Sequence, residues 1–257
     1  MIDVNTFIGG YPWRHVPHPE PAVLARVIER EGLSGAWVGH LPSAFHRDPS
    51  HGNTELVAAL APHAKLLKAV PTVRADWPSV LDDLDIAVRV GAPAVRIYPQ
   101  LLGQGPGDPS VHRLAHEAAR RGLTVMLTVR FEDLRQRHPL DNGPDLSAAH
   151  VRELARGGTG STLVVCAASR EFIEEVHWGL TPVERARVSW DISWLWGPPS
   201  DELSHLLRTI GAGRFHFGSM WPLRLVQAPL ASLALREADV ASVDLADPVT
   251  LPVESAS

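Results

Sequence analysis

Polar and basic side chains recur at alternate positions of two short segments rich in β-branched residues, AVRIYPQ and LTVRFE, which begin at residues 94 and 127. Residues two apart in a strand point to the same side, so each set is expected to face one pocket. Arginines around one opening can bind a carboxylate or another oxyanion through paired hydrogen bonds. The candidate substrate-binding side chains in and just after these segments are Arg96, Tyr98, Gln100, Glu132, Arg135 and His138, and Thr128 and Arg130 share the inward parity.

Acid–base chemistry could come from two further segments, RVSWDIS and RFHFGS. Asp191 lies in the first and His216 in the second, and either side chain near an arginine such as Arg130 can act as a general acid or base. These three residues are the predicted catalytic group. Trp194 and Trp221 follow the same two segments and are expected to wall the site around a planar substrate.

The same residues also allow a purely structural interpretation. Arg130, Glu132, Arg135 and Asp191 can form an ion-pair network that locks a long loop in place. Tyr98 can be a core residue whose hydroxyl is satisfied at the rim. The residue types and their spacing leave the recognition and the structural interpretations open.

A second group of potential metal ligands lies on one loop. His40, His46 and His51 could hold a transition metal, with Asp48 or Asp191 completing the site. Their spacing matches no familiar zinc signature, and solvated loop histidines are the alternative.

Short β-branched segments alternate with longer helical segments along the chain, a pattern typical of βαβ units with a parallel sheet. Eight strand candidates begin near residues 2, 33, 66, 94, 123, 162, 187 and 214, at a spacing of roughly 30 residues that suits a closed barrel. We therefore predict a single (β/α)8 TIM barrel of the α/β class, with an open doubly wound sheet as the alternative. The loops expected on its C-terminal face, where barrels of this kind place their sites, are 9–21, 42–53, 100–108 and 131–145.

Residues 1–239 are expected to form this one domain, and residues 240–257 a flexible C-terminal tail that is poor in aromatic residues. The net charge of −5 and the pI near 6.2 argue against nucleic acid or an anionic membrane as a partner. No apolar run approaches the roughly 20 residues of a membrane span. The apolar stretch Leu223–Leu235 could form a homodimer contact or pack on the barrel.

The single cysteine, Cys166, excludes a disulfide within the chain and any multi-cysteine zinc site. It suits a reducing compartment, and the chain shows no basic segment followed by an apolar one, so a cytoplasmic location is expected. We interpret Cys166 as a buried structural thiol, with a nucleophilic role as the alternative.

Four segments carry a resemblance to a known family. The opening IDVNTFIGGYP, the pair AVRIYPQ and VRFEDLRQRHP, and the later RFHFGSMWPL resemble strands one, four, five and eight of the amidohydrolase superfamily. The likeness is to the branch that contains the aminocarboxymuconate-semialdehyde and resorcylate-type decarboxylases. It implies a TIM-barrel, metal-dependent hydrolase or decarboxylase.

The resemblance also places the family's metal ligands, and this chain departs from them. The Asp-x-His-x-His motif of strand one carries Asn5 and Phe7 at its histidine positions, and the strand-five histidine aligns near Thr128. The strand-six histidine falls near residues 166–168, and Met220 replaces the aspartate of Gly-Ser-Asp-x-Pro. An amide, a phenyl ring, a hydroxyl and a thioether do not form a ligand set for a divalent cation.

The residues and the resemblance together predict a hydrolase or lyase, with decarboxylation included, that acts on a small carboxylated substrate at the C-terminal mouth. Neither a metal nor another cofactor is expected at the degenerate centre. Two alternatives stay open: an enzyme with a divalent metal on non-standard ligands from the histidine loop and Asp191, and a non-catalytic relative that binds a small anion or a partner protein.

Overall fold

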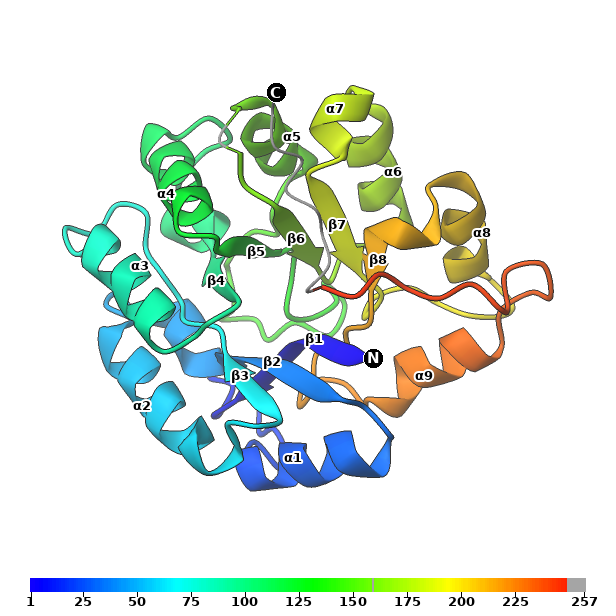
Figure 1. Cartoon of the computed structure of the whole chain (residues 1–257), viewed down its shortest axis with the longest axis horizontal. Helices are drawn as coiled ribbons and strands as arrows, with labels where there is room; N and C mark the ends of the chain where they lie inside the picture. The colour runs from blue at the N-terminus through cyan, green and yellow to red at the C-terminus, as the bar shows by residue number, and fades with distance from the viewer. Residues whose placement is uncertain (159, 249–257) are drawn as a thin grey trace.

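The computed structural model describes residues 1–158 and 160–248, which form eight β-strands surrounded by helices (Figure 1). The strands are β1 (Ile2–Ile8), β2 (Gly35–His40), β3 (Leu67–Ala69), β4 (Ala94–Ile97), β5 (Thr124–Thr128), β6 (Leu163–Cys166), β7 (Val188–Asp191) and β8 (Phe215–His216). The α-helices are α1 (Pro21–Arg30), α2 (Ser50–Leu60), α3 (Val80–Arg89), α4 (Pro109–Arg120), α5 (Ala148–Arg156), α6 (Arg170–Trp178), α7 (Pro182–Arg185), α8 (Glu202–Thr209) and α9 (Gln227–Ala234). The 3-10 helices are η1 (Leu41–Phe45), η2 (Ala61–His63), η3 (Pro99–Leu102) and η4 (Ala212–Arg214).

The outer helices bury one apolar face against the strands because their apolar residues recur every three or four positions. Helix α4 illustrates this, and its buried side chains are Val111, Leu114, Ala115 and Ala118. The helix begins where the Asp108 carboxylate accepts the Ser110 backbone N–H at 2.8 Å. None of the helices in the described part of the chain is long and apolar enough to cross a membrane.

The strands are all parallel and close into a ring. Regular pairing gives two sheets, with the orders β1-β2-β3 and β4-β5-β6-β7-β8. At one seam, the Arg96 N–H donates to the Pro71 carbonyl and the Val73 N–H to the Arg96 carbonyl, both at 2.9 Å. At the other seam, the Val4 N–H donates to the Phe217 carbonyl at 2.9 Å. Backbone hydrogen bonds therefore join the sheets on both sides, which confirms the predicted (β/α)8 barrel.

Apolar side chains fill the interior of the barrel in two separate groups. One group lies around the starts and middles of the strands and consists of Val4, Trp37, Val70, Ala94, Met126, Val164 and Cys166. The other lies at the carboxyl ends and comprises Phe7, Tyr11, Val16, Leu41, Ala44, Tyr98, Phe131, Ala167, Trp194 and Met220. Buried polar side chains lie between these two groups, and they form the centre described below.

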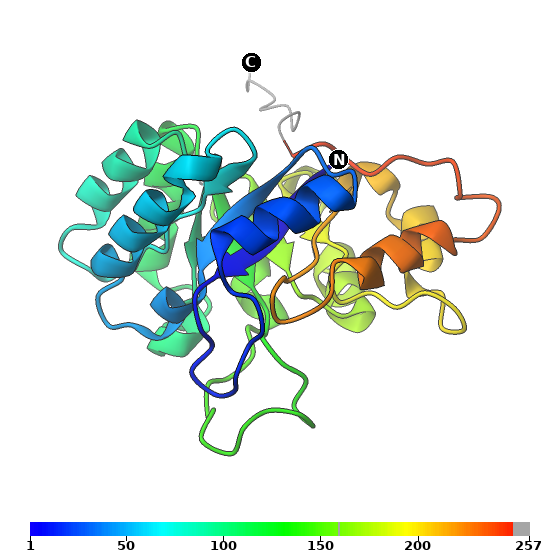
Figure 2. The ribbon, with the colours of Figure 1, turned by 90° about the horizontal axis from the view of Figure 1, so that it is seen from below.

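Part of the segment 240–248, where a flexible tail was predicted to begin, contacts the barrel. Val240 is buried, and the Ala246 N–H donates to the Phe215 carbonyl at 2.8 Å. This segment crosses the end of the barrel opposite to the long loops (Figure 2). It lies there beside the short strand β8, whose other neighbour is β7. The rest of the predicted tail, 249–257, lies outside the described residues.

Candidate functional site

The guanidinium of Arg96 lies at the centre of the barrel. Its side chain extends from β4 and is 0% exposed. Nη1 donates to Asn5 Oδ1 at 2.9 Å and to Thr128 Oγ1 at 3.0 Å, and Cζ lies 4.5 Å from the centroid of the Phe7 ring. Arg96 was predicted to bind substrate near the mouth, but the structure buries it among residues from β1 and β5.

Asp191, at the end of β7, is the carboxylate of this centre and is also 0% exposed. Its Oδ2 accepts the Asn5 side-chain amide at 2.6 Å, and its Oδ1 accepts the Ala167 backbone N–H at 2.8 Å. Burial raises the pKa of Asp191, and hydrogen bonds from Ser193, Ala167 and Asn5, with the charge of Arg96, oppose that rise. Asn5 therefore connects the buried cation to the buried anion.

The donors at this centre do not fit a divalent metal ion. The Asn5 amide oxygen and the Thr128 hydroxyl already accept hydrogen bonds from Arg96, and Phe7 and Met220 offer a ring and a thioether. A guanidinium in their midst would also repel a second cation. Across the described residues, no three His, Cys, Asp or Glu side chains converge as a metal site requires.

The three histidines at and after the end of β2, which were named as possible metal ligands, contact neighbouring side chains. His40 Nδ1 pairs with Ser43 Oγ at 2.8 Å, and its Nε2 lies 3.8 Å from a carboxylate oxygen of Glu55. Burial lowers the pKa of His40, and the Glu55 charge opposes this. The ring of His46 lies 6.4 Å from that of His40, and His51 lies on α2.

An apolar layer covers the buried centre from the mouth, and Phe131 is its hub. Its ring centroid lies 5.4 Å from that of Phe45, 5.6 Å from that of Tyr98 and 5.9 Å from that of Phe7. Tyr98 lies within this layer, and burial raises the pKa of Tyr98 to about 12. Gln100 is buried as well and donates to the Thr128 carbonyl at 2.9 Å. The two side chains thus lie beneath the surface of the mouth.

The long loop after β5 is held by ion pairs, in agreement with the structural alternative for Arg130, Glu132 and Arg135. Glu132 pairs with Arg14 of the first loop. Arg135, whose side chain is 87% exposed, pairs with Asp133 at 2.9 Å and points away from the barrel centre. These two loops project beyond the strand ends (Figure 2).

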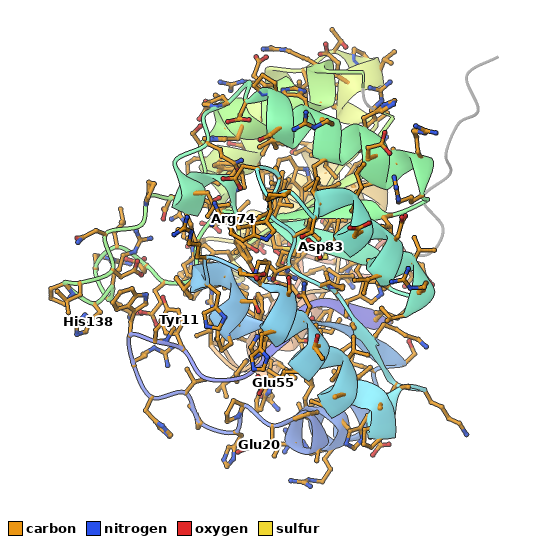
Figure 3. All side chains as sticks on the ribbon, turned by 90° about the vertical axis from the view of Figure 1, so that its left-hand side faces the viewer. Tyr11, Glu20, Glu55, Arg74, Asp83 and His138 are labelled. Atoms are coloured by element: carbon orange, nitrogen blue, oxygen red, sulfur yellow. The ribbon has the colours of Figure 1, made fainter. Side chains whose placement is uncertain are left out.

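The predicted catalytic and binding residues do not share one site. Arg130 contacts Asp145 at 3.2 Å and lies at the mouth, and the His138 ring stacks on Trp13 at 6.0 Å at the tip of the loops, where Figure 3 shows it beyond Tyr11. His216 lies toward the end of the barrel opposite to the mouth, where its Nδ1 donates to the Ala246 carbonyl at 3.0 Å. Burial lowers the pKa of His216. His216 therefore does not join Arg96 and Asp191, although it has the inward parity that was predicted.

One residue of the mouth was missed from the sequence. Arg224, in the loop after β8, places its Cζ 4.6 Å from the Trp194 ring and 5.0 Å from the Trp196 ring. Its Nη1 is buried without a hydrogen-bond partner, and no ion pair of Arg224 is found among the described residues. Burial lowers the pKa of Arg224, and the charge of Asp191 opposes this. The available signal was a basic residue in a loop at the functional face, close to the predicted wall residue Trp221.

Arg130 completes a basic and aromatic surface around the indole of Trp194, with its Cζ 5.9 Å from that ring. We call the four residues Arg130, Trp194, Trp196 and Arg224 the arginine–tryptophan patch. Trp221 is not part of this patch. It packs in the outer core, and its buried Nε1 has no hydrogen-bond partner in the part of the chain that the structure describes.

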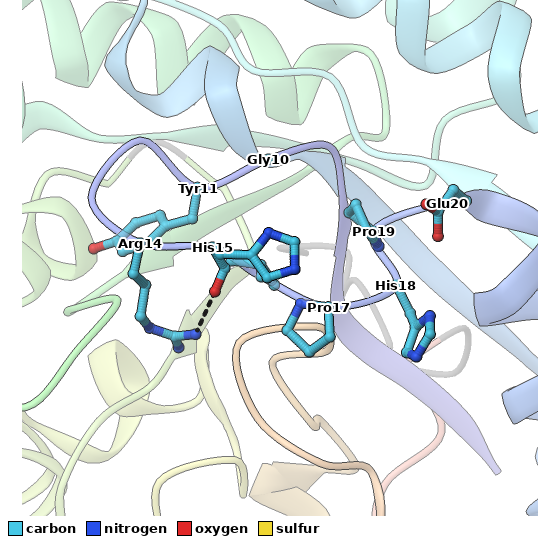
Figure 4. Close-up of a pocket in the computed structure, with 9 residues that line it drawn as sticks. Gly10, Tyr11, Arg14, His15, Pro17, His18, Pro19 and Glu20 are labelled. Carbon is cyan, nitrogen blue, oxygen red and sulfur yellow. Dashed lines mark hydrogen bonds between the residues drawn. The ribbon is translucent and has the colours of Figure 1, made fainter.

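A hollow of about 470 Å³ opens beside the mouth within the loop between β1 and α1 (Figure 4). Its polar lining consists of Arg14, His15, His18 and Glu20, with Tyr11 at one end. Arg14 also donates to the Leu223 carbonyl at 3.3 Å, which ties this loop to the segment that carries Arg224.

Several solved structures share this fold. A 2,6-dihydroxybenzoate decarboxylase complexed with 2,6-dihydroxybenzoate aligns with a TM-score of 0.67 at 14% identity, over 98% of this chain and 96% of that one. The 5-carboxyvanillate decarboxylase of Sphingomonas paucimobilis aligns with a TM-score of 0.64 at 11% identity, over 95% and 93% of the two chains. An amidohydrolase from Burkholderia multivorans gives a TM-score of 0.61 at 14% identity, over 93% of each chain.

No protein-family model and no curated protein sequence matches the chain. The structural likeness at these identities establishes the fold, which is that of the TIM-barrel amidohydrolases. The resemblance to the decarboxylase branch, predicted from four strand segments, is thereby confirmed at the level of the fold.

Proposed function

We propose that this protein binds a small planar carboxylate at its C-terminal mouth and acts on it as a hydrolase or lyase of the amidohydrolase fold, without a metal ion at the barrel centre. The observation that carries the proposal is Arg224, which lies against two indole rings with one buried N–H unpaired. A cation withdrawn from water without a counter-ion is costly, so an anionic ligand here would gain both charge neutralisation and hydrogen bonds. The indole faces favour a planar group beside that anion.

The solved structures with the same fold support this substrate class. Two of them are decarboxylases named for aromatic carboxylates, 2,6-dihydroxybenzoate and 5-carboxyvanillate. Arg130 and Arg224 flank Trp194 at the mouth, so a carboxylate bound to either guanidinium would place an attached ring against the indole.

We propose Asp191 as the acid of the reaction. At rest Asp191 is the anion that Asn5 joins to Arg96, and burial raises its pKa, which eases the uptake of the proton that it then donates as an acid. In a decarboxylation, the bond between the ring carbon and the carboxylate breaks and CO2 leaves. The electron pair that remains on the ring carbon takes the proton of Asp191, and a solvent proton restores the acid. Because Asp191 is covered by the layer around Phe131, that ring must move aside during turnover.

Binding can be tested by thermal unfolding with a panel of benzoates that includes 2,6-dihydroxybenzoate. We expect a saturable rise in Tm, since a ligand of the folded state stabilises it. Arg224→Gln should weaken binding by roughly 10- to 100-fold, because a charge-assisted hydrogen bond contributes about 1.5–3 kcal/mol. Arg135→Gln is the matched control, since that arginine is exposed and pairs with Asp133. Absence of any rise across the panel, or equal weakening by both variants, would refute the proposed site.

A non-catalytic anion-binding protein is the second candidate, and the complete burial of Asp191 beneath Phe131 favours it. Release of CO2 from a bound acid separates the two functions. Turnover by the native protein that Asp191→Asn abolishes, with binding retained, supports the enzyme. Binding without turnover supports the anion-binding protein.

A further inference from the structure

We infer that the guanidinium of Arg96 is a resident cation that takes the place of the metal ion in this barrel. Three of the positions where the family resemblance places metal ligands contact this one side chain. Asn5 and Thr128 accept its hydrogen bonds at 2.9 and 3.0 Å, and the Phe7 ring faces it at 4.5 Å. The replacements are therefore connected, because each provides a contact that suits a guanidinium, while together they lack the carboxylate and imidazole ligands of a divalent metal site.

A chain of hydrogen bonds through Asn5 joins the two charges at this centre, Arg96 and Asp191. Arg96 is 0% exposed, and in the described part of the chain no carboxylate contacts it directly. The Asn5 amide lies between Arg96 and Asp191. Its oxygen accepts a hydrogen bond from Arg96 at 2.9 Å, and its nitrogen donates one to Asp191 at 2.6 Å. A buried cation and a buried anion can both be tolerated when a properly oriented dipole joins them. Asn5 is thus the bridge between them.

Arginine is suited to this position by its shape. One nitrogen of the planar guanidinium reaches acceptors on β1 and β5, while its face lies on an aromatic ring. Through Asn5 the same charge also reaches Asp191 on β7. Arg96 therefore links four strand ends, β1, β4, β5 and β7, where a metal would link strands in a metal-dependent barrel. This assignment does not depend on whether the mouth binds a carboxylate.

Charge compensation tests the inference. Arg96→Met removes the charge and keeps much of the volume, and we expect Tm to fall by about 10 °C, as when one partner of a buried pair is lost. Asp191→Asn in the same chain should recover at least half of that fall, because the anion left without its cation is then neutral. Arg96→Lys should fall between the native protein and Arg96→Met. If Arg96→Met does not fold, recovery of a folded protein by the double variant gives the same answer.

The surface pair Arg121 and Asp85, joined at 2.7 Å with side chains 20% and 51% exposed, is the control, and removal of the Asp85 charge should change Tm by only a few degrees, since Arg121 keeps its second partner Glu117. A tolerated Arg96→Met, or no recovery by Asp191→Asn, would overturn the inference, since Arg96 would then act through packing alone. So would stoichiometric Zn2+ or Mn2+ in the purified native protein with a Tm that falls on treatment with EDTA. A Tm that neither EDTA nor added metal changes supports it.

Discussion

Asp3 should make the protein less stable as the pH rises from 4 to 8, an unusual direction for a carboxylate. The side chain is 0% exposed and lies where β1 meets the turn after β8. Its Oδ1 accepts the backbone N–H groups of Asn5 at 3.1 Å and Ser219 at 3.0 Å, while its Oδ2 is buried and has no hydrogen-bond partner among residues 1–158 and 160–248. Burial raises the pKa of Asp3 from 3.8 to about 7, and the hydrogen bonds from Ser219 and Asn5 oppose this.

Stability falls with rising pH because the pKa of Asp3 is higher in the folded protein than in the unfolded chain. The folded protein holds the Asp3 proton more tightly than the unfolded chain, so this contribution to stability is fully present below pH 3.8 and is lost as the pH rises through about 7. Over that interval the loss is on the order of 4 kcal/mol. Asp3→Asn keeps an oxygen that can accept both N–H groups and removes the titration. The variant should therefore gain stability relative to the native protein as the pH rises.

Urea unfolding of the native protein and Asp3→Asn at pH 4, 5, 6, 7 and 8 measures this difference. Asp191 is present in both proteins, but its charge contributes to the raised pKa of Asp3, so the measured difference includes this coupling between the two carboxyl groups. A difference in the free energy of unfolding that stays constant within about 1 kcal/mol from pH 4 to 8 would refute the reasoning.

Two further outcomes follow from buried contacts. Gly52→Ala should lower the free energy of unfolding by about 1–3 kcal/mol, because the added Cβ would overlap the Ser43 hydroxyl and the His40 ring. This overlap outweighs the preference of alanine for helices. Thermal unfolding measures the effect, and a variant as stable as the native protein would contradict the packing of α2 on η1. The Cys166 thiol should resist a thiol reagent in the native protein and react fully in denaturant. The reason is that Cys166 is 0% exposed and that burial raises its pKa well above the ordinary value. Rapid labelling of Cys166 in the native protein would show instead that the barrel interior opens.

The class of fold could be predicted from the sequence because the signals are local. Alternation of β-branched segments with amphipathic helices depends on side chains a few positions apart, and each strand prediction overlaps or adjoins an observed strand. The inward parity of Arg96, Thr128 and Asp191 is also local, since strand side chains alternate, and all three lie inside the barrel. The contact of 240–248 with the barrel could not be predicted, because this segment has no regular period of its own and Ala246 meets β8 only in the folded chain.

The sequence by itself determined which side chains point into the barrel and that the expected metal ligands are replaced. Only the tertiary structure decided which of those side chains meet. Arg96 reaches Asn5 rather than the mouth, Phe131 covers the centre, and Arg224 lies beside Trp194 with no ion pair to any described residue. The alternation of side chains along a strand predicts whether a residue points into the barrel, but not its position along the barrel axis. Contacts between residues as distant in sequence as Asn5 and Asp191 therefore depend on how the closed ring brings strands β1 and β7 together.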